Sequence, residues 1–332
     1  MKIKTRYLIS SMSALIAFLL TISCEKKTSP ALIEKGTFPD SLIILSDINS
    51  AYDDYNSDIH QLSAASPIVF SSNRGSSGGQ FDLVHGAFAY NFVQENGDFF
   101  LFSEMAPDPF LSQLVSKVNT ALNDFGPYRF YSPIDGYEYL VVSSENSSGD
   151  IDFQYTKNLP YFGTTIPAIA DAKPVVLLNS SDNDVYFCFN TGQDTAYFCC
   201  DTDGSFDIWM YPKQTEATMD EWFSQEAATP VRVEALSSAA NDKCPYIFRK
   251  IMVFASDREG GLGGFDLYYS EFENGVWGAP VNFGPAVNTS SDEYRPILSG
   301  NEDFTNMFLL FSSDRPGGEG GFDLYFYGTD LF

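Results

Sequence analysis

Two glycine-rich segments of nearly identical sequence carry residue types that often do chemistry. SDREGGLGGFDLY occupies 256–268, and SDRPGGEGGFDLY occupies 313–325. Their arginine, aspartates and glycines could form a phosphate cradle, a metal-binding loop or part of a catalytic site. A phosphate cradle needs backbone N–H groups at the start of a helix, and a P-loop also needs a lysine. The residues after these glycines are strand-like and neither loop contains lysine, which excludes nucleotide binding.

Residues 75–79 form a third glycine-rich segment with the pattern G-x-S-x-G, which also occurs in the nucleophile elbow of hydrolases. That elbow requires a strand-to-helix turn and a histidine partner. This segment leads into a strand instead. We therefore interpret the match as coincidence.

A phenylalanine or isoleucine followed by aspartate occurs five times, each time before apolar residues. A catalytic residue is needed once, so this repetition favours an architectural role. An aspartate at the start of a strand can accept hydrogen bonds from loop N–H groups and hold a glycine-rich turn in place. The structural blade aspartates predicted in this way are Asp82, Asp152, Asp207, Asp266 and Asp323.

Three arginines accompany the longest of these loops, at Arg74, Arg258 and Arg315. We expect them to pair with loop aspartates such as Asp266 and Asp323, or to cover a neighbouring strand. No metal site is indicated by the rest of the sequence, which has no CxxC pair and only two histidines. Calcium held by loop carboxyl and carbonyl oxygens is the alternative, so we expect no cofactor other than this cation.

The elements that position these residues are short strands. Each blade aspartate follows an apolar run, such as MVFAS at 252–256 or FLLFSS at 308–313, and a further apolar segment comes after it. Segments rich in Val, Ile, Phe and Tyr and bounded by turn residues indicate β-strands. Residues 107–123 form the one expected helical insertion. Five copies of a four-strand unit predict an all-β, five-bladed β-propeller, rather than one of six blades.

The two ends of the chain predict how the ring closes. The last copy lacks its outer strand, and residues 38–55 align without gaps on residues 277–294. We therefore expect the N-terminal strand to complete the fifth blade and remove its exposed edge. The propeller should cover residues 36–332, with blade repeats ending near residues 84, 155, 211, 270 and 327.

The blade pattern resembles that of a known family. Ser-Asp-Arg, Gly-Gly-x-Gly-Gly, Phe-Asp-Leu-Tyr, Trp-Gly-x-Pro and Asn-Thr-x-x-Asp-Glu-x-x-Pro are similar to the WD-repeat-like propeller repeat of TolB-type proteins. Copies four and five match closely and copies two and three weakly. The resemblance implies a propeller of the Gram-negative periplasm or outer membrane that binds other proteins.

Acidic residues recur where the outer strand of one predicted blade leads to the inner strand of the next. In a closed ring these crossings would gather carboxylates at one mouth of the central channel and attract a cation or a basic segment of a partner. Arg129 and Arg295 follow two crossings and would neutralise part of the ring. The alternative is that each acid caps its own turn. The candidate acids are Asp53, Asp54, Asp124, Asp182, Asp184, Asp242, Asp292 and Glu293.

The first residues have the organisation of an export signal. Basic residues precede an apolar stretch that leads to Thr21-Ile22-Ser23-Cys24, which resembles a bacterial lipobox. We expect a signal peptide over 1–23, lipidation of Cys24, and a tether over 24–35. This predicts an outer membrane lipoprotein, periplasmic or surface-exposed, that contacts the membrane through its lipid alone. A plain secretory signal is the alternative.

Composition narrows the function classes further. The chain has 44 Asp+Glu and 19 Lys+Arg, a net charge of −25, which excludes nucleic acid as a partner. In an oxidising compartment Cys188 could bridge Cys199, although buried free thiols are about as consistent with the sequence. No acid–base pair stands out. We therefore expect a non-enzymatic scaffold that binds an envelope protein, with a glycan-binding or glycoside-hydrolase-like propeller as the alternative.

Overall fold

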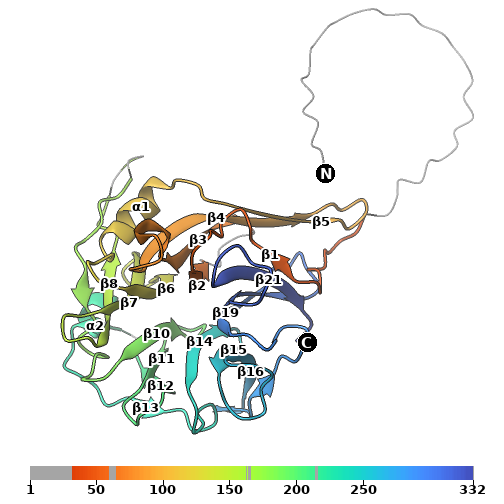
Figure 1. Cartoon of the computed structure of the whole chain (residues 1–332). Helices are drawn as coiled ribbons and strands as arrows, with labels where there is room; N and C mark the ends of the chain where they lie inside the picture. Colours follow the sequence, from red (N-terminus) through yellow and green to blue (C-terminus); the bar gives the residue numbers. More distant parts are fainter. Residues whose placement is uncertain (1–31, 60–64, 162, 164–165, 214–215, 332) are drawn as a thin grey trace, which may run out of the picture.

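A computed structural model describes residues 32–59, 65–161, 163, 166–213 and 216–331. Within these ranges the chain forms five antiparallel sheets arranged around a common centre (Figure 1). The prediction of an all-β, five-bladed propeller is confirmed. Cys24 and the expected signal lie outside the described residues.

Each blade runs from an inner strand at the channel to an outer strand, which is only two residues long except in blade one. Blade one contains β2 (Asp54–Ile59), β3 (Ala65–Ser72), β4 (Asp82–Phe92) and β5 (Phe99–Glu104), and blade two β6 (Asp124–Tyr131), β7 (Glu138–Glu145), β8 (Ile151–Lys157) and β9 (Lys173–Pro174). Blade three contains β10 (Asp184–Phe189), β11 (Thr195–Cys200), β12 (Asp207–Pro212) and β13 (Val231–Arg232). Blade four contains β14 (Asp242–Phe248), β15 (Ile251–Ser256), β16 (Asp266–Glu273), and the short β17 (Val276–Trp277) and β18 (Val281–Asn282), which both pair with β16.

Blade five closes the ring as predicted. It contains β19 (Glu293–Ser299), β20 (Met307–Ser313) and β21 (Asp323–Thr329), and its fourth strand is β1 (Ile43–Ile44) from the N-terminal side. The register places Ile43 opposite Phe326 and Ile44 opposite Tyr325. Figure 1 shows β1 beside β21, so residues from both ends of the chain share one sheet.

In the residues that the structure describes, helical structure is confined to short connections. The expected helix is α1 (Pro109–Ser116), which Asp108 caps by accepting hydrogen bonds from two backbone N–H groups. A second helix, α2 (Met219–Phe223), was not predicted because one turn and a half is too short to show a helical period. A 3₁₀ turn, η1 (Arg74–Ser76), precedes β4. No helix in the described part of the chain has the length and apolarity needed to cross a membrane.

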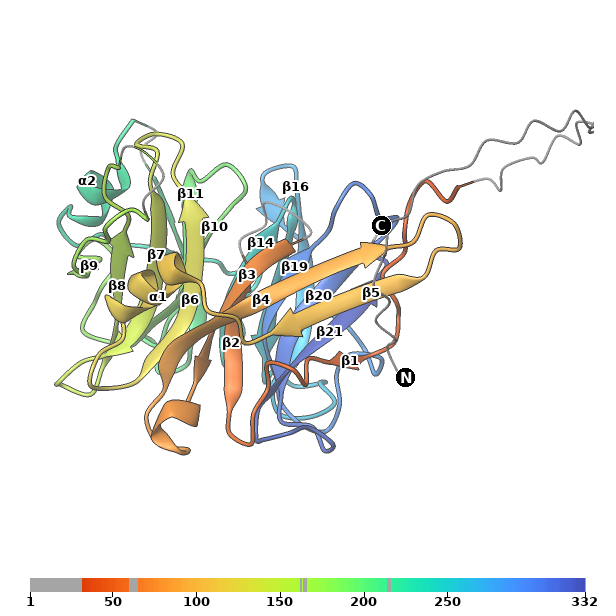
Figure 2. The same cartoon turned by 90° about the horizontal axis from the view of Figure 1, so that it is seen from above.

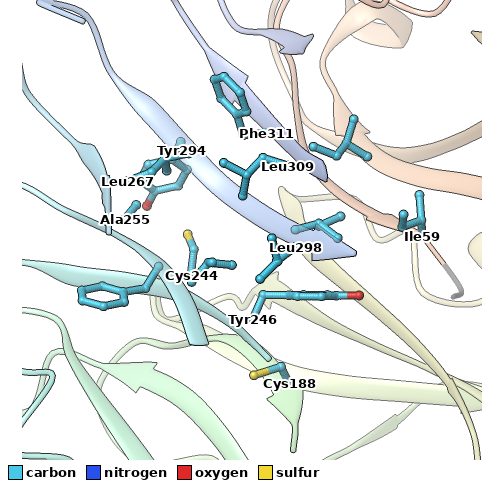
Figure 3. Packing of buried hydrophobic residues seen from close by; sticks show 14 of the residues in the cluster. Ile59, Cys188, Cys244, Tyr246, Ala255, Leu267, Tyr294, Leu298, Leu309 and Phe311 are labelled. Atoms are coloured by element: carbon cyan, nitrogen blue, oxygen red, sulfur yellow. The ribbon is translucent and has the colours of Figure 1, made fainter. Parts of the chain in front are cut away.

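The core lies between blades, where the two innermost strands are almost entirely buried. In Figure 3 residues of several inner strands, including Cys188, Cys244, Tyr246 and Leu298, converge on one another. Aromatic rings fill the outer part of the wedge, and Phe38 stacks on Phe304 with centroids 3.9 Å apart. Figure 2 shows β4 and β5 extending as a long hairpin toward blade five, where Phe99 stacks on Phe326.

The described cysteines are the buried free thiols that the sequence left open. Cys188 lies opposite Tyr197 in the β10–β11 register, and Cys199 lies opposite Val185, so the two sulfur atoms are not cross-strand partners.

Each inner strand carries a bulge at its third residue. The hydrogen-bond register shifts there, and the backbone φ is positive, between 47° and 62°. Only one of the five is a glycine, although a left-handed conformation is costly for other residues. Bulges re-aim side chains, so this repeated device governs which side chains face the channel. The five residues are Asn56, Gly126, Tyr186, Cys244 and Arg295.

Candidate functional site

Five of the eight predicted mouth acids are the first residues of the inner strands, and all five are buried. Each accepts a hydrogen bond from the backbone N–H four residues earlier, as Asp54 does from Ser50 at 2.6 Å and Asp242 from Ser238 at 2.6 Å. The structure therefore favours the turn-capping alternative for these residues. They are Asp54, Asp124, Asp184, Asp242 and Glu293, at 0–1 % exposure.

The three loop arginines pair with these strand-leading acids rather than with the blade aspartates. Arg74 forms an ion pair with Asp54 at 2.6 Å, Arg315 pairs with Glu293 at 2.8 Å, and Arg258 pairs with Asp242. The expected partners Asp266 and Asp323 instead accept backbone N–H groups of their own loops. The expectation for the arginines is corrected because the loop folds back over the start of its own blade.

The blade aspartates differ from blade to blade. Asp266 and Asp323 brace glycine-rich loops, whereas Asp82 accepts from Gln80, Asp152 from Asn146 and Asp207 from Arg232. The glycines are needed where the loop meets the next crossing, because a Cβ on Gly263 or Gly320 would overlap carbonyl oxygens of that crossing.

The remaining predicted acids are partly exposed and serve as links between neighbours. Asp53 accepts the Phe322 N–H at 3.0 Å, and Asp292 accepts the Phe265 N–H at 2.7 Å, so each joins its blade to the preceding one. Asp182 accepts the Thr202 hydroxyl. The structure thus brings the eight acids to one end of the ring but engages them in local hydrogen bonds.

Aromatic side chains contact one another inside this end of the ring. The ring centroid of Tyr55 lies 5.0 Å from that of Phe81 and 5.6 Å from that of Phe322. The ring centroids of Tyr294 and Phe265 are 5.1 Å apart. Within the described residues, no group of three or more His, Cys, Asp or Glu side chains is arranged to hold a metal ion.

The inner strands end at a cavity of about 430 Å³. It is lined by the ends of β2, β6, β10 and β14 and by the turns after β6, β10 and β14, and so draws on four blades. These turns differ from one blade to the next in length and sequence. Its lining includes Ile59, Tyr128, Arg129, Tyr131, Gln193, Tyr246 and Arg249.

Arg129 is the central polar residue of the cavity wall. It is 6 % exposed, its Nε donates to Glu138 Oε1 at 2.9 Å, and its backbone N–H donates to Asp58 Oδ2 at 3.0 Å. Burial raises the pKa of Asp58 to about 6, an effect that the nearby Arg129 and Arg295 guanidinium groups only partly offset. Asp58 therefore binds a proton more tightly than an exposed aspartate does.

Aromatic and amide groups complete the wall. Tyr131 is 49 % exposed, and Gln193 donates to the Tyr131 carbonyl at 2.9 Å while its own buried Oε1 has no hydrogen-bond partner among the described residues. Gln193 has a φ of 52°, a strained conformation for this residue type. An aromatic face beside amide and guanidinium donors suits a ligand with both apolar faces and hydroxyl groups.

The sequence analysis noted Arg129 and Arg295 but expected them to neutralise the acidic ring. Arg129 instead pairs with Glu138, and Arg295 Nη2 donates to the Pro127 carbonyl at 2.9 Å. Asp58 and Glu138 were missed. The available signal was irregularity, since Asp58 is the one acidic residue at its position in the five aligned inner strands.

No known family model matches the chain, and no curated protein matches its sequence. Solved structures do match in fold. The catalytic domain of a GH62 α-L-arabinofuranosidase from Coprinopsis cinerea is 14 % identical, with a TM-score of 0.50 over 90 % of this chain and 98 % of that one. An endo-arabinase from Bacteroides thetaiotaomicron is 10 % identical, with a TM-score of 0.51 over 89 % and 98 %. RS223 β-xylosidase is 10 % identical, with a TM-score of 0.52 over 87 % and 94 %.

These matches correct two expectations. The similar structures are glycoside hydrolases and not TolB-type or WD-repeat proteins, so the predicted resemblance is wrong. Its motifs are the glycine turns and Phe-Asp links that hold blades together, which any propeller with such blades can use. The prediction of a non-enzymatic, protein-binding scaffold is contradicted by the same finding. At these identities the likeness is one of fold.

Proposed function

We propose that this protein is a glycoside-hydrolase-like propeller that binds a glycan in the cavity where its inner strands end. The observation that carries the proposal is Arg129, held in the cavity wall between Asp58 and Glu138 and accompanied by the exposed Tyr131 ring. Sugars present C–H faces that stack on aromatic rings and hydroxyl groups that pair with planar donors. The cavity volume is within the usual range for small-ligand sites, about 300–1,000 Å³.

Hydrolysis of a glycan would require a proton donor and a second carboxylate. Two carboxylates contact Arg129. Asp58 accepts a hydrogen bond from its backbone N–H, and Glu138 accepts one from its guanidinium group. The raised pKa of Asp58 suits a proton donor, and Glu138 is the second carboxylate beside Arg129. We assign Asp58 the role of acid and Glu138 the role of base.

Binding is tested by titrating neutral trisaccharides, such as xylotriose and cellotriose, into the protein by calorimetry. Tyr131→Ala should weaken binding at least tenfold, because it removes the stacking face. Tyr161→Ala is the matched control, since Tyr161 is 52 % exposed but does not line the cavity. Equal losses in both variants, or no binding of any oligosaccharide, would overturn the proposal.

The acid and base roles are tested separately by release of reducing sugar from arabinan and xylan. Asp58→Asn and Glu138→Gln should each lower the rate by about 100-fold or more, the size typical of general acid–base catalysis. Wild-type protein that binds a glycan but releases no sugar would reject these roles and leave the binding site standing.

We also propose that the protein acts in the bacterial envelope, attached through Cys24. The support is the order of basic, apolar and lipobox-like residues at the start of the chain. Metabolic labelling with a radioactive fatty acid should label the wild type and not Cys24→Ala.

A further inference from the structure

Three charged side chains from three inner strands are buried in the channel beside the cavity. Asp58 comes from β2, Arg129 from β6 and Arg295 from β19, and their exposures are 1 %, 6 % and 0 %. Their neighbours in the inner strands are mostly apolar or aromatic, such as Tyr128, Tyr186 and Tyr246. Arg295 is one of the left-handed bulge residues, with φ at 47°, so its backbone is strained to place this side chain.

The hydrogen-bonding capacity of this cluster is only partly used. Arg295 Nη2 donates to a carbonyl, but within the described part of the chain its Nε and Nη1 have no partner, and neither do Arg129 Nη1 and Asp58 Oδ1. Among the ion pairs of the described residues, none joins Asp58 to either arginine. A buried donor left without a partner costs about 1–3 kcal/mol, and more for a charged group. Such a cluster is suited to a polar group that enters from outside.

The identity of that group follows from the donors. Three of the four unpaired atoms are guanidinium nitrogens, which donate hydrogen bonds and repel cations. The planar guanidinium matches a carboxylate through paired N–H···O contacts. Arg129 also lines the cavity, so a carboxylate carried by a ligand in the cavity would meet this arginine first.

We propose that the cluster of Asp58, Arg129 and Arg295 is a carboxylate-binding site that selects glycans containing a uronic acid. This inference rests on the proposed glycan site and specifies its ligand. The guanidinium nitrogens would bind the uronate oxygens. Asp58 opposes them when charged, and its protonation lets the two arginines act on the ligand alone.

The test compares an acidic oligosaccharide with its uncharged counterpart on the full chain. Trigalacturonate and its methyl ester share one sugar backbone and differ in the carboxylate charge. At pH 6 the free acid should bind at least tenfold more tightly. Arg295→Met should reduce that preference to less than threefold while the methyl ester binds as before. Arg249→Met is the matched control, because Arg249 lines the cavity but is exposed, and it should retain the preference.

A second variant guards against misfolding of the buried Arg295 substitution. Asp58→Asn removes the competing carboxylate and should tighten trigalacturonate binding about threefold or more at pH 7. Equal affinity of wild type for acid and ester would overturn the carboxylate site and leave glycan binding intact. Absence of binding by acid, ester and neutral trisaccharides would overturn the glycan site as well.

Discussion

The two ends of the central channel are built from the same five inner strands and differ in almost every other respect. Where the strands begin, each blade repeats one arrangement, in which a buried acid caps the crossing and a side chain just before it bonds to the preceding blade. Where the strands end, the turns differ from blade to blade and leave a cavity. The repeated end holds the ring together, and the irregular end provides the candidate site.

In this protein the repeated residues are structural, and the residues that differ between blades form the candidate site. Acids that recur five times attract attention in the sequence, but recurrence is what a structural requirement of every blade produces. A ligand needs one particular set of groups, which only divergence between blades can supply. Asp58, Arg129 and Arg295 each break the pattern of the inner strands and come together in the channel.

The strongest way to separate the two ends is to remove an acid from the repeated one. Asp242 accepts from Ser238 N–H and Ser256 Oγ, both at 2.6 Å, and pairs with Arg258. Asp242→Ala should lower the free energy of unfolding by about 3 kcal/mol, since it removes a fully buried carboxylate together with its two hydrogen bonds and leaves the partly buried Arg258 guanidinium without its counter-charge. Urea denaturation measures the loss.

Asp182→Ala provides the control at the same end of the ring. Asp182 is only partly buried and accepts one hydroxyl, so its removal should change stability by less than about 0.5 kcal/mol. If both variants lost similar free energies of unfolding, the strand-leading acids would contribute no more to stability than the partly exposed acids at the same end.

The sequence was sufficient for the fold because the fold depends on repeated residues. The alignment of 38–55 on 277–294 predicted ring closure, and Asn49 bonds to Leu324 as Asn288 bonds to Leu267. The site was not predicted, because it depends on how five strands converge in space. Asp58 and Glu138 are 80 residues apart in the chain and meet only through Arg129. The bulge that turns Arg295 into the channel also has no signal in a strand pattern.

The pH dependence of the free energy of unfolding tests the buried Asp58 in the channel. Burial raises the pKa of Asp58 to about 6, above its unfolded value near 3.8, so the folded protein holds this proton more tightly. The free energy of unfolding should therefore fall as pH rises from about 4 to 6. Arg129, Arg295, Glu138 and Tyr128 face this carboxyl and set its charge balance.

Burial raises the pKa of Asp124 and Asp184 to about 6 as well, so these two residues also lower the free energy of unfolding as pH rises. Asp58→Asn should remove its own share of the decrease, about 2 kcal/mol between pH 4 and 7. Urea denaturation of wild type and variant at several pH values would show the difference as a shallower slope. Parallel curves would place the Asp58 pKa near its ordinary value.

A smaller effect is expected from the side-chain links between blades. Asn183 accepts the Ile151 N–H from the preceding blade at 3.0 Å and donates to Asp201 at 2.7 Å. Asn183→Ala should lower the free energy of unfolding by about 1 kcal/mol, the usual net value of such bonds. Asn190→Ala at the opposite end removes bonds confined to one hairpin and should cost less. The reverse order would contradict the assignment of the repeated end as the one that joins the blades.

The smallest effect on stability and a large effect on binding are expected together at Gln193. With the described residues its side chain makes one hydrogen bond, to the Tyr131 carbonyl, which leaves its Oε1 available to a ligand hydroxyl. Gln193→Ala should change the free energy of unfolding by less than about 0.5 kcal/mol. Because the ligand loses a buried acceptor, the same variant should bind xylotriose at least fivefold more weakly by calorimetry. A stable variant with unchanged affinity would show that Gln193 is not part of the glycan site. A destabilised variant would show that the irregular end contributes to stability, contrary to the role proposed for it.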